Sequence, residues 1–312
     1  MKSLLAFTLA TALGATGAFA DDFPNKTLTM VVPFAAGGGT DTGARIAAAS
    51  LEKALGKTIV VTNVEGAGGS VGVTSVADAA PDGYTIGFFP IGPMATQPHA
   101  RKVQYTTDSF TPICRLVNDP IAVLVGPDKF KSYEEMKAAI EAGDTLLSAG
   151  PAPGSMPNIA QHALANSLGA KFQYVPFQGG NLVAQALLAG KVDVSTEMAS
   201  FADRFGLQRL AILGDNRHPA FPDTPSLTEL GGPSLNFSIW QGVYAPAGLP
   251  EDVTAKLTEA CKTAAESEEY RQRVKDAGAQ VDYLNSEDFT AFYKAQFEML
   301  GKVMADAGLA AQ

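Results

Sequence analysis

The stretch Val31-Val32-Pro33-Phe34-Ala35-Ala36-Gly37-Gly38-Gly39-Thr40-Asp41 joins an apolar segment to a glycine-rich turn and then to a predicted helix. Apolar and β-branched residues predict a buried strand over Leu28–Val32. After the turn, alanines and leucines recur at helical spacing, which predicts a helix over Asp41–Leu55, capped by Thr40 or Asp41 and ended by Gly56. The stretch is therefore a strand, a turn and a helix, the unit from which parallel α/β sheets are built.

The three successive glycines predict an anion-binding turn. Because they carry no Cβ atoms, backbone N–H groups at the turn can approach a ligand closely. The helix behind the turn adds roughly half a positive charge at its N-terminus. We expect a carboxylate or a phosphate to bind there.

The rest of the chain repeats this order of elements, which predicts an α/β fold with mainly parallel sheets flanked by helices. The predicted strands are Thr58–Val64, Thr85–Phe89, Ile121–Val125, Thr145–Ala149, Phe172–Pro176, Val192–Thr196, Arg209–Gly214 and Ser238–Tyr244. The predicted later helices are Tyr133–Glu141, a helix ending at Gly169, Leu182–Leu188, Glu251–Glu266, Glu268–Asp276 and Ser286–Ala307. The length exceeds what one core usually serves. We expect a discontinuous domain 1 (residues 21–123 and 241–312), a domain 2 (residues 124–240) and a ligand cleft between them.

A second anion-binding turn before a helix is predicted at Gly150-Pro151-Ala152-Pro153-Gly154-Ser155, with Ser155 as the predicted N-cap. Glu197 follows a predicted strand and is placed to accept a hydrogen bond from a ligand amine or hydroxyl. The alternative for Glu197 is a solvated loop acid. Ile91, after the strand Thr85–Phe89, is expected in the cleft wall or as loop filler.

Glycines at 66, 68 and 72 invite a dinucleotide-binding interpretation. That fingerprint needs a matched acidic residue after the next strand, and such glycine spacings recur by chance. A tight turn that lets helix and strand pack closely beside a cleft is the better interpretation, so we expect no cofactor.

The first twenty residues have the pattern of a secretory signal peptide: Lys2, a mostly apolar segment from Leu4 to Leu13, and Ala18-Phe19-Ala20 before Asp21. The apolar segment is too short to span a bilayer. We expect cleavage after Ala20 and an exported mature protein.

The chain is acidic, with 23 Lys and Arg against 32 Asp and Glu and a formal net charge of −9, which becomes −10 when Lys2 is removed with the signal peptide. This charge argues against nucleic acid and anionic membrane surfaces as partners. The two cysteines, Cys114 and Cys261, form a disulfide or remain two isolated thiols. The three histidines are scattered without metal-ligand spacing, so we expect no metal site.

The opening decamer Val32–Asp41, followed by Arg45, resembles the signature of the tripartite tricarboxylate transporter solute receptors, the TctC or Bug family of bacterial periplasmic binding proteins. The resemblance continues in family order over nearly the whole mature chain, in the blocks Gly66-Ala67-Gly68-Gly69, Ala79-Ala80-Pro81-Asp82-Gly83-Tyr84-Thr85, Val175-Pro176-Phe177-Gln178-Gly179-Gly180, Pro222-Asp223-Thr224-Pro225-Ser226 and Trp240-Gln241-Gly242-Val243-Tyr244-Ala245-Pro246-Ala247-Gly248.

This resemblance implies a two-domain Venus-flytrap receptor, monomeric and periplasmic, that is not an enzyme. Such a receptor captures a small carboxylate (a di- or tricarboxylate, an aromatic carboxylate or an acidic amino acid) and delivers it to a tripartite tricarboxylate-type membrane permease. The ligand contacts that it implies are Phe34, Ala36, Gly38, Gly39, Thr40 and Asp41 from one domain, with Ser148, Gly150, Gly154, Ser155, Asn158, Phe177 and Glu197 from the other. Family members resembling this chain hold carboxylates largely through backbone N–H groups and water.

Three departures from the family pattern leave the ligand open. Val64-Glu65 stands where Arg-Pro is usual, Asn158 replaces a frequent His, and Thr196-Glu197-Met198 stands where Phe-Asp-Asn is common. The rival function is an exported α/β hydrolase. Its serine chemistry needs a nucleophile beside a base, but no Gly-x-Ser-x-Gly elbow is present, and Ser155 and His162 are predicted about two helical turns apart.

Overall fold

The fold is described by a computed structural model over residues 23–150, 155–177 and 180–311. Its strands are β1 (Leu28–Val32), β2 (Ile59–Asn63), β3 (Thr85–Pro90), β4 (Phe110–Val125), β5 (Thr145–Gly150), β6 (Lys171–Pro176), β7 (Val194–Met198), β8 (Gln208–Ile212), β9 (Ser238–Pro246) and β10 (Val281–Leu284). Its helices are α1 (Gly39–Leu55), α2 (Ser70–Ala77), α3 (Gln97–Ala100), α4 (Tyr133–Glu141), α5 (Met156–Leu168), α6 (Gly180–Leu188), α7 (Ser200–Phe205), α8 (Glu251–Glu266), α9 (Glu268–Asp276) and α10 (Ser286–Asp306). Short helical turns cover Ala67–Gly69, Gly92–Thr96 and Thr107–Ser109.

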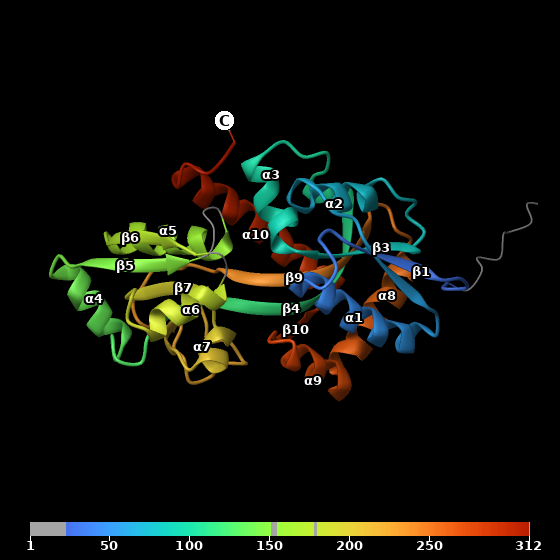
Figure 1. The fold of residues 1–312 in the computed structure, drawn as a ribbon. Helices are drawn as coiled ribbons and strands as arrows, with labels where there is room; N and C mark the ends of the chain where they lie inside the picture. The colour runs from blue at the N-terminus through green and yellow to red at the C-terminus, as the bar shows by residue number, and fades with distance from the viewer. Residues whose placement is uncertain (1–22, 151–154, 178–179, 312) are drawn as a thin grey trace, which may run out of the picture.

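The strands form one mixed sheet in the order β2-β1-β3-β9-β4-β7-β5-β6, with β8 and β10 also paired to β4. We call β1, β2, β3, β9, β10 and the start of β4 the first half-sheet, and β5, β6, β7, β8 and the end of β4 the second. Within each half-sheet, the strands that precede the glycine-rich turns pair in parallel, β1 with β2 and β3, and β5 with β6 and β7. Figure 1 shows β4 and β9 running side by side through the middle of the molecule, between the two groups of elements.

The carboxyl ends of the two sets of parallel strands meet at the middle of the molecule. Pro90 at the end of β3 pairs with Gln241 of β9, which in turn pairs with Val117 of β4. From the opposite direction, Met198 at the end of β7 pairs with Ile121 of β4. Because parallel neighbours end at the same edge, the carboxyl ends of β1, β2 and β3 face the same central region as those of β5, β6 and β7.

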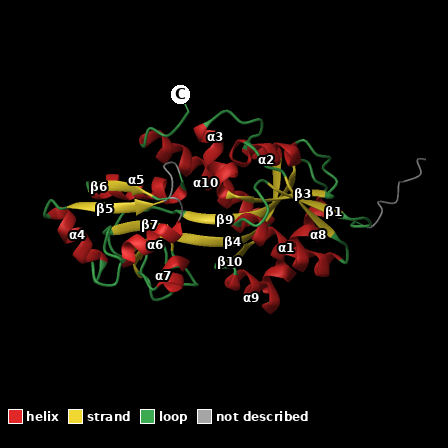
Figure 2. Cartoon of the chain, in the orientation of Figure 1, coloured by secondary structure: helices red, strands yellow, loops and turns green. Residues whose placement is uncertain are grey.

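Helices cover both faces of the sheet (Figure 2), and the apolar residues beneath them form the core. One cluster joins β1 and β3 to α1 and α8 through residues such as Met30, Leu51 and Leu257. A second cluster extends across both half-sheets, from Phe89 through Trp240 to Ile159, and includes the buried face of α10. A third cluster packs α6 and α7 on the second half-sheet.

The two cysteines form a disulfide, which settles the alternative that the sequence leaves open. Cys114 of β4 and Cys261 of α8 are bonded, with their Cα atoms 6.4 Å apart. Both residues are buried in the core beneath α1 and α8. The disulfide therefore ties a late helix of the chain to the central strand.

Candidate functional site

The first glycine-rich turn is organised by Asp41, which is buried in the first turn of α1. Asp41 Oδ2 accepts hydrogen bonds from Gly37 N at 2.8 Å and from Arg45 Nε at 2.9 Å. Its Oδ1 accepts one from Asn63 Nδ2 at 2.9 Å, and the same Asn63 nitrogen donates to Phe34 O at 2.8 Å. These contacts hold the turn from both ends. Both oxygens of the Asp41 carboxylate are engaged by residues of the first half-sheet and its helix α1.

The prediction that Thr40 or Asp41 caps this helix is wrong. Asp41 instead acts through its negative charge. The N-cap is Gly38, which has no side chain, and α1 begins at Gly39. The hydrogen bond from Arg45 lowers the pKa of Asp41 to about 2, against the opposing effect of burial. Asp41 is thus ionised and positions the turn, while Ala36, Gly38 and Gly39 are exposed and Thr40 is half-buried.

The turns after β2 and β3 pack against the first glycine-rich turn. A Cβ atom on Gly69 would lie 3.3 Å from the Phe34 ring and 3.1 Å from Pro93. A Cβ on Gly72 would lie 2.9 Å from Pro33 Cα, so α2 needs glycine here to approach the end of β1. This confirms a close-packing role for Gly72. Ile91 is buried in the apolar cluster beneath α10.

In the second half-sheet, the predicted site residues gather between β5, β6 and α5. Ser148 is buried, and its Oγ accepts a hydrogen bond from Gln161 Nε2 of α5. Asn158 is buried and hydrogen-bonds to Tyr174 of β6. The Tyr174 hydroxyl also lies 2.7 Å from where a Cβ on Gly150 would be, so this glycine admits the phenol to the end of β5.

Tyr174 is a candidate site residue that the sequence analysis missed. It is half-buried, and burial raises its pKa to about 12, so that the hydroxyl stays protonated. Tyr174 lies opposite Ser148 in the parallel register of β5 and β6. Only the pairing of the two strands brings Tyr174 beside Ser148, and no local motif around Tyr174 indicates a site residue.

Ser155 is the N-cap residue of α5, as predicted, but its side chain makes no capping hydrogen bond. Its buried Oγ has no hydrogen-bond partner among the described residues. Phe177 is half-buried just after β6. Gly154, the remaining predicted contact of this turn, lies outside the described residues.

Glu197 lies within β7 and is not a solvated loop acid, because only 2% of the residue is exposed. Its Oε2 accepts a hydrogen bond from Met198 N at 3.1 Å, and its Oε1 has no partner. Burial raises the pKa of Glu197 to about 7, and the nearby charge of Asp119 contributes in the same direction. Asp119 of β4 is a second candidate that the sequence analysis missed, because Pro112, Arg115 and Asp119 make this part of the strand look like a loop when it is read locally.

A polar cluster lies where β4 and β9 cross the middle of the molecule. Asp282 Oδ2 of β10 accepts from Arg115 Nη2 at 2.6 Å and from Asn118 Nδ2 at 2.9 Å, and it lies 3.6 Å from His218 Nε2. Burial alone would raise the pKa of Asp282, but His218, Arg115 and Asn118 lower it to about 2. A cavity of about 190 Å³ borders this cluster and is lined in part by Asn118, His218 and Phe292.

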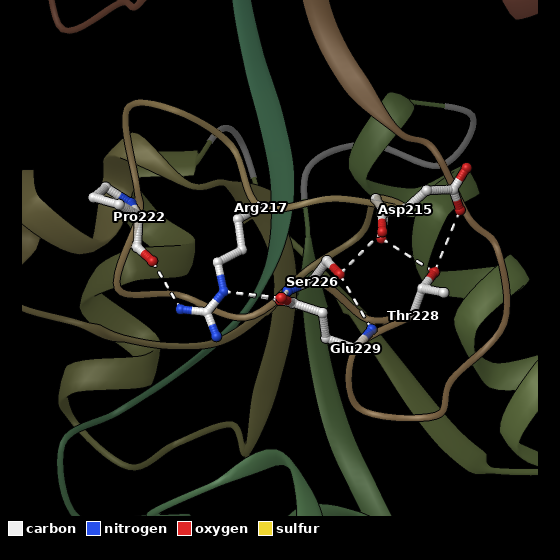
Figure 3. A network of polar contacts seen from close by, with 7 residues as sticks. Asp215, Arg217, Pro222, Ser226, Thr228 and Glu229 are labelled. Atoms are coloured by element: carbon white, nitrogen blue, oxygen red, sulfur yellow. Dashed lines mark hydrogen bonds and ion pairs between the residues drawn. The ribbon is translucent and has the colours of Figure 1, made fainter.

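The connection between β8 and β9 carries its own polar network (Figure 3). Arg217 donates to the Glu229 carboxylate and to Pro222 O. Asp215 contacts Ser226 through its backbone oxygen and Thr228 through its carboxylate. These contacts fold the connection back on itself beside the crossing strands. Their partners are all within the connection, so the network is structural.

A larger cavity, of about 800 Å³, lies between α7 and the connection from α9 to β10. Its lining includes Ser200 and Arg204 from one side and Gly278 and Gln280 from the other. In the described part of the chain, no group of three or more His, Cys, Asp or Glu residues is placed to hold a metal ion. No described helix is both long and apolar enough to cross a membrane.

A sequence model for the tripartite tricarboxylate transporter family receptors, TctC, matches residues 43–309. A UPF0065 protein of Agrobacterium vitis is 29% identical, over 92% of this chain and 86% of its own length. A UPF0065 protein of Bordetella pertussis is 28% identical, over 98% of this chain and 97% of its own length. The similarity therefore extends over nearly the whole chain.

Solved structures share the fold over similar lengths. A TctC solute-binding protein from Polaromonas, without ligand, has a TM-score of 0.84 at 27% identity, covering 91% of this chain and 99% of that one. MatC of Rhodopseudomonas palustris with bound malate has a TM-score of 0.67 at 32% identity, covering 90% and 99%. The R. palustris protein Rpa4515 with adipate has a TM-score of 0.72 at 25% identity, covering 93% and 99%. The mixed α/β fold is that of two-domain periplasmic binding proteins.

Proposed function

Because the chain belongs to the TctC family of tripartite tricarboxylate transporter receptors, we propose that it captures a small carboxylate between its two halves and delivers it to a membrane permease of that transporter type. The observation that carries this proposal is the meeting of two sets of strand ends at the middle of the molecule. Each set presents a glycine-rich helix start, at Gly38 for α1 and at Ser155 for α5.

The chemistry of the first turn suits a carboxylate. Its exposed backbone lies at the start of a 17-residue helix, where an anion is favoured by about 0.3–1 kcal/mol, or by about 2 when partly buried. The only basic side chain of this turn, Arg45, is already paired with Asp41. The anion would therefore be held by backbone N–H groups and water, each charge-assisted hydrogen bond contributing roughly 1.5–3 kcal/mol.

We propose that each half-sheet with its helices is one domain, with boundaries within the crossing strands: residues 21–123 and 241–312 form domain 1, and residues 124–240 form domain 2. Bending of β4 and β9 would then close the cleft over the ligand.

The family is one of periplasmic binding proteins, and a periplasmic location after cleavage at Ala20 is part of this proposal. The signal peptide lies outside the described residues. We further propose a monomer that acts as a receptor and not as an enzyme. In support, Ser155 Oγ has no base within hydrogen-bond distance among the described residues. The described residues therefore do not provide the nucleophile and base pair that the hydrolase alternative needs at Ser155.

Calorimetric titration with a carboxylate panel that includes malate and adipate tests this function. We expect at least one acid to bind the parent protein, and its neutral amide analogue not to bind. Gly38→Val should abolish binding by covering the backbone of the turn, and Gly38→Ala should weaken it less. Gly38 has φ −76°, which any residue adopts, and its Cβ position has only Ala35 O at 3.5 Å, so neither substitution strains the fold. Unchanged binding by folded Gly38→Val would contradict the proposed site.

A further inference from the structure

Two buried carboxylates lie on adjacent strands at the middle of the molecule, and each has one oxygen without a partner. Asp119 of β4 and Glu197 of β7 are each 2% exposed. Asp119 Oδ1 accepts from Ser200 N at 3.4 Å, and Glu197 Oε2 accepts from Met198 N at 3.1 Å. Asp119 Oδ2 and Glu197 Oε1 accept no hydrogen bond from any described residue.

Glu197 has no compensating cation beside it among the described residues, and the charge of His218 is the one that favours ionised Asp119. The titratable groups that act on Glu197 are Asp119 from β4 and Tyr174 from β6, and His218 acts on Asp119 from the β8–β9 connection. Neither carboxylate forms an ion pair with a Lys or Arg among the described residues, and Arg209 nearby is paired with Asp203. A buried carboxylate without an ion-pair partner is unfavourable, so Glu197 favours either a bound proton or a positive charge supplied by a ligand.

The position of Glu197 points to the ligand as the source of that charge. Its Oε1 lies under the first turn of α6, 3.3 Å from where a Cβ on Gly180 would be. That turn follows the carboxyl end of β6, on the same central edge as the end of β5. The edge faces the glycine-rich turn before α1, where the proposed carboxylate binds, so a small ligand held there has its other end toward the second half-sheet.

We propose that Glu197 selects ligands that carry an ammonium group in addition to the carboxylate, so that the ligand class is an amino-substituted carboxylate. This inference rests on the proposed carboxylate-binding function. The ammonium donates to Glu197 Oε1 and offsets the charge of both buried acids, while the carboxylate binds at the first turn. A plain diacid brings a second negative charge to the same place and is disfavoured unless Glu197 is protonated.

The number of protons released or taken up on binding distinguishes a ligand with an ammonium group from a plain diacid. Burial raises the pKa of Glu197 to about 7 and that of Asp119 to about 6, so near pH 7 the ligand-free protein holds Glu197 partly protonated. An ammonium at Oε1 favours the ionised carboxyl and releases a proton on binding. A second ligand carboxylate favours the protonated form and takes up a proton.

The test is calorimetry at pH 7 in two buffers of different ionisation enthalpy, with two matched pairs of probes: aspartate and succinate, and glutamate and glutarate. In the parent protein, we expect the amino acid of at least one pair to bind at least ten-fold more tightly than its diacid and to release protons. In Glu197→Gln, the preference should disappear, together with the proton release. Glu141→Gln, which makes the same change on the distant helix α4, should keep both. Thermal melting checks that the variants fold.

The outcomes separate this inference from the proposed function. If the parent binds the diacids as tightly as the amino acids, or if Glu197→Gln keeps the preference, ammonium selection is overturned and carboxylate capture still stands. If no carboxylate binds the folded parent, including those of the wider panel, both are overturned.

Discussion

Asp41 and Glu197 are both buried carboxylates, but their surroundings act on them in opposite directions. Asp41 accepts three hydrogen bonds, one of them from Arg45, and its pKa falls from 3.8 to about 2. Glu197 accepts one, and its pKa rises from 4.5 to about 7 because burial dominates. The first group therefore stabilises the fold when ionised, and the second when protonated.

The raised pKa of Glu197 predicts a pH dependence of stability. Its contribution is fully present below pH 4.5 and is lost as the pH rises through about 7, because the folded state binds the proton more tightly than the unfolded state. The loss should amount to up to about 3 kcal/mol of the free energy of unfolding. Urea unfolding between pH 4.5 and 8 should show this decline in the ligand-free parent and a flatter profile in Glu197→Gln. Parallel profiles for the two proteins would show that Glu197 does not titrate in this range.

Asp41→Asn should loosen the first glycine-rich turn. The change keeps the volume of the side chain but removes the charge that holds Gly37 N and the Arg45 side chain, so we expect a loss of about 1–3 kcal/mol in the free energy of unfolding and weaker carboxylate binding. Asp203→Asn, which removes an exposed acid paired with Arg209, should cost no more than about 1 kcal/mol. Chemical unfolding at pH 7 measures both. Equal effects of the two substitutions would remove the special role of Asp41.

At the scale of elements, regular patterns were predicted well and interrupted ones were not. The bounds of β1, α4, α8 and α9 agree with the prediction, because each has a clear periodicity and clear end signals. For β4, only Ile121–Val125 was predicted of a strand that begins at Phe110. Its earlier part contains Pro112, Arg115 and Asp119, which indicate a loop when read locally.

Contacts that are distant in sequence explain these errors. Arg115 is buried because Asp282 of β10 pairs with it, and Asp119 because Ser200 of α7 donates to it. The elements β10 and α7 were themselves not predicted, being four and six residues long with little periodicity. For the site, the glycine turns were recognised by local sequence, whereas Tyr174 and Asp119 depend on strand register.

The disulfide gives a prediction at this scale. It closes a loop of 147 residues between β4 and α8, and loss of such a bond costs about 2–5 kcal/mol. The double variant Cys114→Ser with Cys261→Ser should therefore melt at a lower temperature than the oxidised parent, and added reductant should lower the melting temperature of the parent alone. Identical melting of the variant and the oxidised parent would mean that the bond adds no stability.

At the scale of the whole molecule, the long strands β4 and β9 join two groups of elements whose parallel strands end toward one central region. The polar cluster of Arg115, Asn118 and Asp282 lies at the crossing, with a cavity of about 190 Å³ beside it. A second cavity, of about 800 Å³, lies between α7 and the α9–β10 connection. The proposed closure would move the two halves together about β4 and β9.

Hydrogen exchange with and without a saturating carboxylate tests most directly the claim that both halves hold the ligand. The probe is whichever acid of the panel binds the parent protein. We predict that backbone amides become protected both at residues 36–42, at the start of α1, and at residues 155–160, at the start of α5, because each set of N–H groups lies at a helix start where the ligand is proposed to bind. Protection confined to one of these segments, or found only elsewhere at saturation, would contradict capture between the two halves.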